Sequence, residues 1–118
     1  MVILFAKCEQ KNTPKTIEKC HCSDLTYDET YNHYYQNKST LPYTGKCMEL
    51  NNHGALILTN NFIEGKMQGE MIRYQKNGNR ASLLEYDKNL IHGSAIFYDI
   101  NGKDSLVQQY QRGKLFTK

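Results

Sequence analysis

The sequence predicts an all-β protein, a single-layer antiparallel sheet built as a meander of tandem 24-residue β-hairpins. Two observations concern spacing: glycines recur every 24 residues in the C-terminal two-thirds of the chain, and aromatic and apolar residues recur in the same register. The third is composition, because mean hydropathy is only −0.71 although nine residues are tyrosine. A sheet with one wet face explains this, since tyrosine rings pack while their hydroxyl groups stay in water.

The repeat takes the form of columns of similar residues in three successive units. The columns are Gly45, Gly69, Gly93; Gly54, Gly78, Gly102; Gly65, Asn89, Gly113; Phe62, Tyr86, Tyr110; Met48, Ile72, Ile96; Leu50, Tyr74, Tyr98; and Met67, Ile91, Leu115. Chance does not produce this many columns in one register, so we interpret the region as a tandem repeat.

Each unit reads as one hairpin. Residues 69–74 form a short segment rich in β-formers, Asn77-Gly78 is a strong hairpin-turn signal, and residues 80–86 form the second strand. The chain then turns back at Asn89, the non-glycine residue type that best accepts a left-handed conformation. We therefore expect six short antiparallel strands from about Gly45 to Phe116, in sequence order. The expected turns are at Gly54, Gly65, Gly78, Asn89 and Gly102.

Packing and binding roles follow from the alternation of side chains along a strand. The column Phe62, Tyr86, Tyr110 predicts an aromatic ladder inside the sheet, and Met48, Ile72, Ile96 predict a second row. Tyr74 shares a face with Ile72, and Tyr98 shares a face with Ile96. Because an uncovered sheet leaves such apolar and aromatic surface wet, we expect a partner to bind across Tyr74 and Tyr98.

The region before the repeats is less regular. We divide the chain into an irregular N-terminal segment or tether, residues 1–24, and a repeat domain, residues 25–118. A degenerate fourth unit is expected ahead of Gly45, with a turn at Asp28-Glu29-Thr30 that the aspartate side chain caps. Atypical terminal units are common because they cap a stack of repeats.

Three of the four cysteines lie in this N-terminal region. Cys8 follows a short apolar run and precedes a polar stretch, which resembles a bacterial lipoprotein cleavage site, although Lys7 departs from that pattern. A lipid-bearing Cys8 leaves three cysteines, enough for one disulfide and one thiol. In an exported protein Cys22–Cys47 is the preferred pair and Cys20–Cys47 the alternative. In a cytoplasmic protein all thiols stay reduced.

The sequence gives little support for a metal site or a catalytic site. A metal site could be formed by Cys20-His21-Cys22 with His33 or Cys47, but the Cys-x-Cys spacing is atypical of zinc sites and no metal is predicted. No motif surrounds the serines and aspartates, and no phosphate-binding loop is present, so neither catalysis nor a cofactor is expected. A net charge of +3 spread along the chain does not indicate nucleic-acid binding.

The units resemble the bacterial variant of the MORN repeat, on residues Gly69 to Gly78, then Tyr86, Asn89 and the next opening glycine, Gly93. The resemblance covers roughly residues 34–116, and the first unit departs from it where Leu50-Asn51-Asn52-His53 replaces the aromatic approach to the turn. It implies a non-catalytic role, because bacterial members are often labelled antitoxin components, and many are described as lipoproteins.

The function expected from these features is binding to a protein partner, in the manner of an antitoxin or immunity protein that neutralises a toxin. The alternative is an envelope-associated structural or lipid-surface protein, although the dispersed charge gives little attraction to anionic lipid. The expected location is the cell envelope, with an anchor at Cys8, and the alternative location is the cytoplasm.

Overall fold

A computed structural model describes residues 19–37 and 39–116 of the chain. In this part the structure is all-β, with one short 3₁₀ turn, η1 (Cys22–Asp24), and no α-helix. The strands are β1 (Lys19–His21), β2 (Leu25–Asp28), β3 (His33–Gln36), β4 (Gly45–Leu50), β5 (Leu56–Ile63), β6 (Lys66–Met67), β7 (Gly69–Tyr74), β8 (Arg80–Asp87), β9 (Leu90–Tyr98), β10 (Asp104–Gln111) and β11 (Lys114–Leu115). The all-β, antiparallel fold class expected from the sequence is thereby confirmed.

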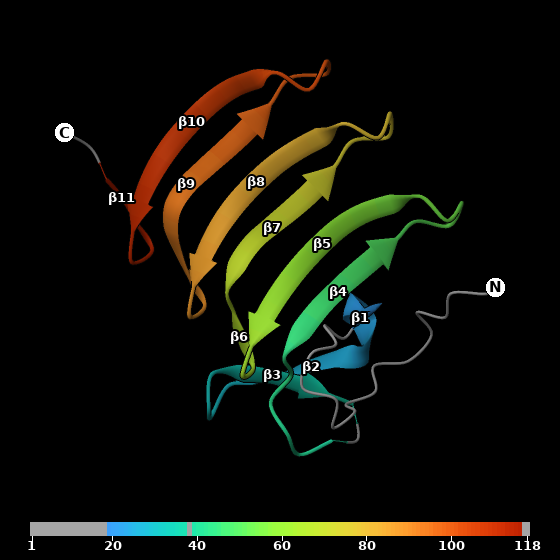
Figure 1. Cartoon of the computed structure of the whole chain (residues 1–118), viewed down its shortest axis with the longest axis vertical. Coiled ribbons are helices and arrows are strands. Elements are labelled where there is room, and N and C mark those ends of the chain that lie inside the picture. Colours follow the sequence, from blue (N-terminus) through green and yellow to red (C-terminus); the bar gives the residue numbers. More distant parts are fainter. Residues whose placement is uncertain (1–18, 38, 117–118) are drawn as a thin grey trace.

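The strands form a large curved sheet and a small hairpin (Figure 1). The order in the large sheet is β1-β4-β5-β7-β8-β9-β10-β11, with β6 paired to β5. From β4 to β11 every pairing is antiparallel, and the strands follow one another in sequence order. The hairpin tips lie together at one end of the sheet, and the turns between hairpins lie at the other end.

Backbone conformation at the tips follows the glycine spacing. Gly54, Gly78 and Gly102 have φ of 81°, 90° and 83°, values that favour glycine over residues with a Cβ. At the opposite end, the turns place Gly65, Asn89 and Gly113 at φ of 83°, 74° and 85°. All five turns expected from the sequence therefore lie where it placed them.

Each turn between hairpins is tied back to the preceding unit. The backbone N–H of Gly65 donates to the Tyr43 carbonyl at 2.7 Å, that of Asn89 to Met67 at 3.0 Å, and that of Gly113 to Ile91 at 2.8 Å. These three bonds are spaced 24 residues apart, like the sequence columns. A side-chain acceptor adds a second tie in each unit: Thr44 Oγ1 accepts from Glu64 N, Gln68 Oε1 from Lys88 N, and His92 Nδ1 from Arg112 N.

The N-terminal part differs from the expectation in two ways. Residues 19–21 belong to the sheet as β1, which pairs parallel to β4, so they are not part of an irregular tether. Residues 1–18 lie outside the described residues. The hairpin β2–β3 forms a separate two-stranded sheet and is not a fourth unit of the large one. Its turn is capped as expected, because Asp28 Oδ1 accepts from Thr30 N at 2.8 Å.

The core lies where this hairpin meets the large sheet. Cys20, Tyr43, Cys47 and Phe62 are each at most 4% exposed and form one cluster. The Phe62 ring centre lies 5.0 Å from that of Tyr34 and 5.8 Å from that of Tyr43. The region between the N-terminal segment and the first repeat strand, β4, therefore supplies the aromatic partners of Phe62.

The predicted aromatic ladder is consequently wrong in its contacts. In the pairing register, Phe62, Tyr86 and Tyr110 each lie opposite the strand-opening glycine of the neighbouring strand. The strand that contains this glycine lies between two successive aromatic residues of the column. The aromatic residues are therefore not on adjacent strands and do not stack directly on one another.

Candidate protein-binding surface

Tyr74 and Tyr98 close the first strands of the second and third hairpins. Tyr74 lies opposite Arg80, and Tyr98 lies opposite Asp104, each beside a β-bulge in the returning strand. The same irregularity occurs in the first hairpin beside Leu50, so it recurs in every unit. Both tyrosines are half-buried, more enclosed than the open surface position expected for them.

Hydrogen bonds within the second hairpin tip, and between it and the third hairpin tip, hold the region around these tyrosines. Gln75 Nε2 donates to the Asp99 carbonyl at 2.7 Å and to the Arg80 carbonyl at 2.9 Å. The side-chain amides of Asn77 and Asn79 both donate to the Ile100 carbonyl, at 2.9 and 3.2 Å. These bonds connect the residues that follow Tyr74 to those that follow Tyr98, so the two tips are held together.

Exposed apolar side chains gather on the last hairpin. Of the twelve large hydrophobic residues exposed in the described part of the chain, seven lie between residues 90 and 116: Leu90, Phe97, Ile100, Leu106, Val107, Leu115 and Phe116. A shallow hollow lies at the same edge, lined by His92, Gly93, Gln109, Tyr110, Gln111 and Phe116. Exposed apolar side chains are a common feature of interaction sites, so the last hairpin is the candidate region.

Sequence reasoning missed most of this surface. It singled out Tyr74 and Tyr98 because they are aromatic, whereas the structure leaves Leu106 and Val107 about half exposed, at 50% and 49%. Both residues belong to β10, the last long strand of the sheet. The strand order expected from the repeat contained the signal, because it places the second strand of the third hairpin at the outer edge of the six predicted strands.

A second aromatic group lies on the β2–β3 hairpin, away from the last hairpin (Figure 1). Tyr27 and Tyr31 are exposed, and the ring of Tyr27 packs against that of Tyr34 at 4.9 Å between centres. Burial, with the neighbouring Tyr27 hydroxyl, raises the pKa of Tyr34. Burial also raises the pKa of Tyr86, and Tyr34 adds to that rise while Arg73 opposes it. Tyr34 therefore lies between the hairpin and the large sheet.

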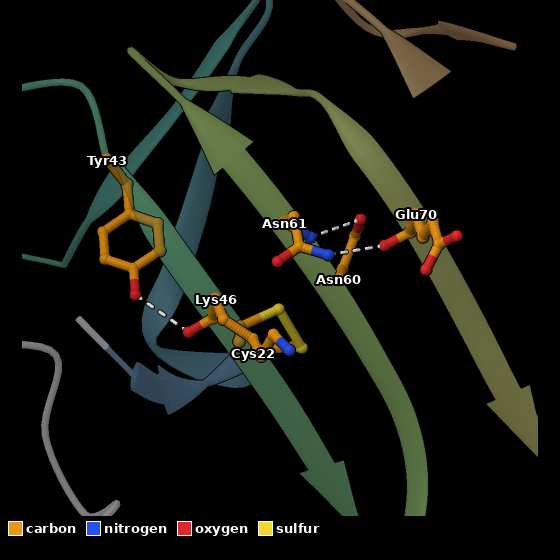
Figure 2. Close-up of a disulfide and its surroundings, with 7 residues drawn as sticks. Cys22, Tyr43, Lys46, Asn60, Asn61 and Glu70 are labelled. Atoms are coloured by element: carbon orange, nitrogen blue, oxygen red, sulfur yellow. Dashed lines mark hydrogen bonds between the residues drawn. A yellow bond between two sulfur atoms is a disulfide. The ribbon is translucent and has the colours of Figure 1, made fainter. Parts of the chain in front are cut away.

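A disulfide joins Cys22 to Cys47, with a Cα–Cα distance of 4.8 Å (Figure 2). This is the pair favoured by the sequence, and it fastens the segment after β1 to strand β4. Cys20 is also disulfide-bonded, so none of the three cysteines in the described residues is a free thiol. The one free thiol expected among them from the sequence is therefore not found. Cys8, the candidate lipidation residue, lies outside the described residues.

Figure 2 also shows hydrogen bonds in the surroundings of this disulfide. The Tyr43 hydroxyl donates to the Lys46 carbonyl at 2.9 Å, and Asn61 Nδ2 donates to the Glu70 carbonyl at 2.7 Å. The second bond links β5 to β7 next to the glycine that opens β7. The residues around the disulfide thus have a structural role, through packing and hydrogen bonds.

The described residues contain no group of three or more histidine, cysteine, aspartate or glutamate side chains placed to hold a metal ion. The Cys22–Cys47 bond also occupies two of the sulfurs that a site around Cys20-His21-Cys22 would need as thiolates. No helix in the described part is long and apolar enough to cross a membrane.

Comparison with known proteins adds no relative. No family model, no curated protein and no solved structure matches this chain.

Proposed function

We propose that residues 25–118 form a domain of MORN-like hairpin repeats that acts as a non-catalytic protein-binding module. The proposed role is that of an antitoxin or immunity protein, which neutralises a partner protein by covering it. Two observations support the repeat assignment: positive φ recurs every 24 residues, and so do the bonds that tie each turn to the preceding unit. Repeat arrays present extended surfaces that suit protein partners.

The observation that carries the binding role is the exposed apolar surface of the last hairpin. Phe97, Leu106 and Val107 are 38%, 50% and 49% exposed, although they lie within strands β9 and β10. The tips beside Tyr74 and Tyr98 are held by four side-chain hydrogen bonds. A rigid, partly apolar surface of this kind loses little conformational entropy on binding.

The test is affinity capture from the source cells with the tagged chain as bait, followed by mass spectrometry. One stoichiometric protein partner is the expected result. The variant Tyr74→Ala/Tyr98→Ala should weaken the binding of that partner at least tenfold while the chain still folds, because tyrosines at interfaces often dominate binding. Since both tyrosines are half-buried, the melting temperature of the variant is measured alongside.

The matched control is Tyr27→Ala/Tyr31→Ala, which removes two exposed tyrosines from the β2–β3 hairpin. It should leave the partner bound. Loss of the partner in the control, with retention in Tyr74→Ala/Tyr98→Ala, would move the site to the hairpin and contradict the proposal.

The second candidate is an envelope-associated structural or lipid-surface protein, favoured by the lipoprotein-like sequence around Cys8. Co-sedimentation with liposomes in the absence of any protein partner would support it. Intact mass of the membrane-extracted protein tests the anchor at Cys8, because acyl chains add a fixed mass that reduction does not remove.

A further inference from the structure

The sheet contains two rows of side chains that run across all its long strands and stop at β10. On one face the pairing register aligns Met48, Thr59, Ile72, Leu83, Ile96 and Val107. On the other face it aligns Glu49, Leu58, Arg73, Ser82, Phe97 and Leu106. Thr59, Ile72 and Leu83 are 6–8% exposed, whereas Val107 at the end of their row is 49% exposed. The first row is therefore buried inside the sheet and uncovered at its last strand, whereas the second row has exposed side chains along its length, among them Glu49, Arg73 and Phe97.

The backbone of β10 is also open there. β11 pairs with Tyr110 and Gln111, and the backbone N–H of Phe116 donates to the Gln109 carbonyl at 2.7 Å. The register with β9 is regular from Leu106 to Tyr110, so the N–H and carbonyl of Val107 point outward like the carbonyl of Gln109. Within the described residues, the outer edge of β10 has no partner strand along residues 104–108.

Most proteins protect such an edge with charges or proline. In the open stretch, residues 104–108, only the first residue, Asp104, is charged, and none is a proline. A strand edge with free backbone groups and apolar side chains on both faces is a template for another strand.

We propose that this edge binds an extended segment of the partner protein, which adds to the sheet as the strand antiparallel to β10. The inference rests on the proposed protein-binding function and specifies its mode. The interior of the sheet indicates the chemistry of the segment. Ile72 lies opposite Thr59, and Ile96 lies opposite Leu83, so an apolar β-branched residue fits opposite Val107. Phe97 lies opposite Ser82, so an aromatic or other large residue fits opposite Leu106.

A second copy of this chain fits the edge less well. Two β10 strands paired antiparallel along residues 104–108 would each bring the β9–β10 tip, residues 99–103, against residues 109–111 of the other copy. That stretch already carries β11 and the bond from Phe116. A strand from a different protein can leave the sheet before it reaches this obstruction.

The test uses a fluorescein-labelled synthetic peptide that copies residues 93–98, the sequence Gly-Ser-Ala-Ile-Phe-Tyr, which pairs with β8 inside the sheet. Binding to the full chain is followed by fluorescence anisotropy. Val107→Pro removes the outward N–H and leaves the bonds to β9, and it should weaken binding at least about tenfold. Val107→Ala keeps the N–H and should weaken binding less. A peptide with proline in place of its isoleucine is the control and should not bind.

Circular dichroism and a thermal melt establish whether Val107→Pro folds. If it does not, Leu106→Lys, which places a charge on the same edge, must show the loss of peptide binding in its place. Equal peptide binding by the wild type and the folded edge variants would overturn the proposal. So would a dimer of the wild-type chain in sedimentation that the edge variants abolish, because a second copy would then occupy the edge.

The outcome separates this inference from the proposed function. A captured partner that binds wild type and Val107→Pro equally would reject strand addition and leave the protein-binding role intact. Absence of any protein partner, with normal peptide binding at the edge, would reject the antitoxin-like role.

Discussion

At the scale of single residues, Asn89 shows how a repeat position acquires a specific task. Glycine fills the equivalent positions, Gly65 and Gly113, and Asn89 adopts a similar φ of 74°. Its side chain does more than tolerate that conformation. Oδ1 accepts from the Met67 N–H at 2.8 Å, and Nδ2 donates to the Asn32 carbonyl at 2.8 Å. Asn89 thereby links the large sheet to the turn of the β2–β3 hairpin.

Asn89→Gly should therefore destabilise the protein by about 1–2 kcal/mol, because the left-handed turn survives and the side-chain hydrogen bonds to Met67 and Asn32 are lost. The column of glycines alone would predict a neutral or stabilising change. Urea denaturation measures the free energy of unfolding. Gly113→Asn is the control, and it should cost less because its φ of 85° suits asparagine. An Asn89→Gly variant as stable as the wild type would show that these bonds contribute nothing.

The side-chain acceptors at Thr44, Gln68 and His92 show what the sequence could not reveal. They occupy equivalent positions and accept equivalent backbone hydrogen bonds at 2.8–3.1 Å. Threonine, glutamine and histidine share only an acceptor atom, so the column has no visible similarity in the sequence. The glycine columns were predictable because backbone conformation restricts residue type strongly, whereas a hydrogen-bond acceptor restricts it weakly.

At the scale of elements, prediction succeeded where the contacts are local. Each repeat hairpin is specified by a turn signal and two flanking segments, and these elements lie where the sequence placed them. The parallel pairing of β1 with β4 joins residues such as Cys20 and Cys47, which are far apart in sequence and are not connected by a single hairpin turn. Likewise, the β2–β3 hairpin was detectable from its turn, but its separation from the large sheet was not.

The Cys22–Cys47 disulfide fastens the segment after β1 to strand β4. The next prediction concerns the loss of this disulfide. Cys22 and Cys47 are separated by 25 residues in the sequence. Closing a loop of that size lowers the entropy of the unfolded chain by an amount that corresponds to about 3.5 kcal/mol. Cys22→Ala/Cys47→Ala should therefore lower the free energy of unfolding by roughly 2–4 kcal/mol.

Chemical denaturation of the non-reduced proteins measures this difference. The double variant leaves no unpaired thiol from this pair, so disulfide exchange does not complicate the comparison. Identical unfolding energies for wild type and variant, together with free thiols at Cys22 and Cys47 in the purified wild type, would show that the pair is reduced in solution.

At the scale of the whole molecule, burial is graded along the sheet. Cys20, Tyr43, Cys47 and Phe62 are nearly inaccessible where the β2–β3 hairpin packs, whereas Leu106, Val107 and Phe116 are about half exposed at the far edge. The end near β1 therefore contains the buried core, and the end near β10 exposes apolar side chains. Sequence columns could not reveal this gradient, because they assign the same pattern to every unit.

The contact between the hairpin and the large sheet should make stability sensitive to alkaline pH. Tyr34 and Tyr86 have a pKa raised above 10.0, first by burial and then by neighbouring tyrosine hydroxyls. The folded state thus holds these phenolic protons more tightly than the unfolded state does. The resulting stabilisation is fully present below pH 10 and is lost as the pH rises through the folded-state pKa. The free energy of unfolding should therefore fall above about pH 10.

In Tyr34→Phe/Tyr86→Phe the fall in the free energy of unfolding should be shallower, while the exposed control Tyr31→Phe should follow the wild type. Urea denaturation across this pH range, with phenolate absorbance recorded in parallel, measures both effects. Identical pH profiles for the wild type and the double variant would mean that neither tyrosine couples its proton to folding.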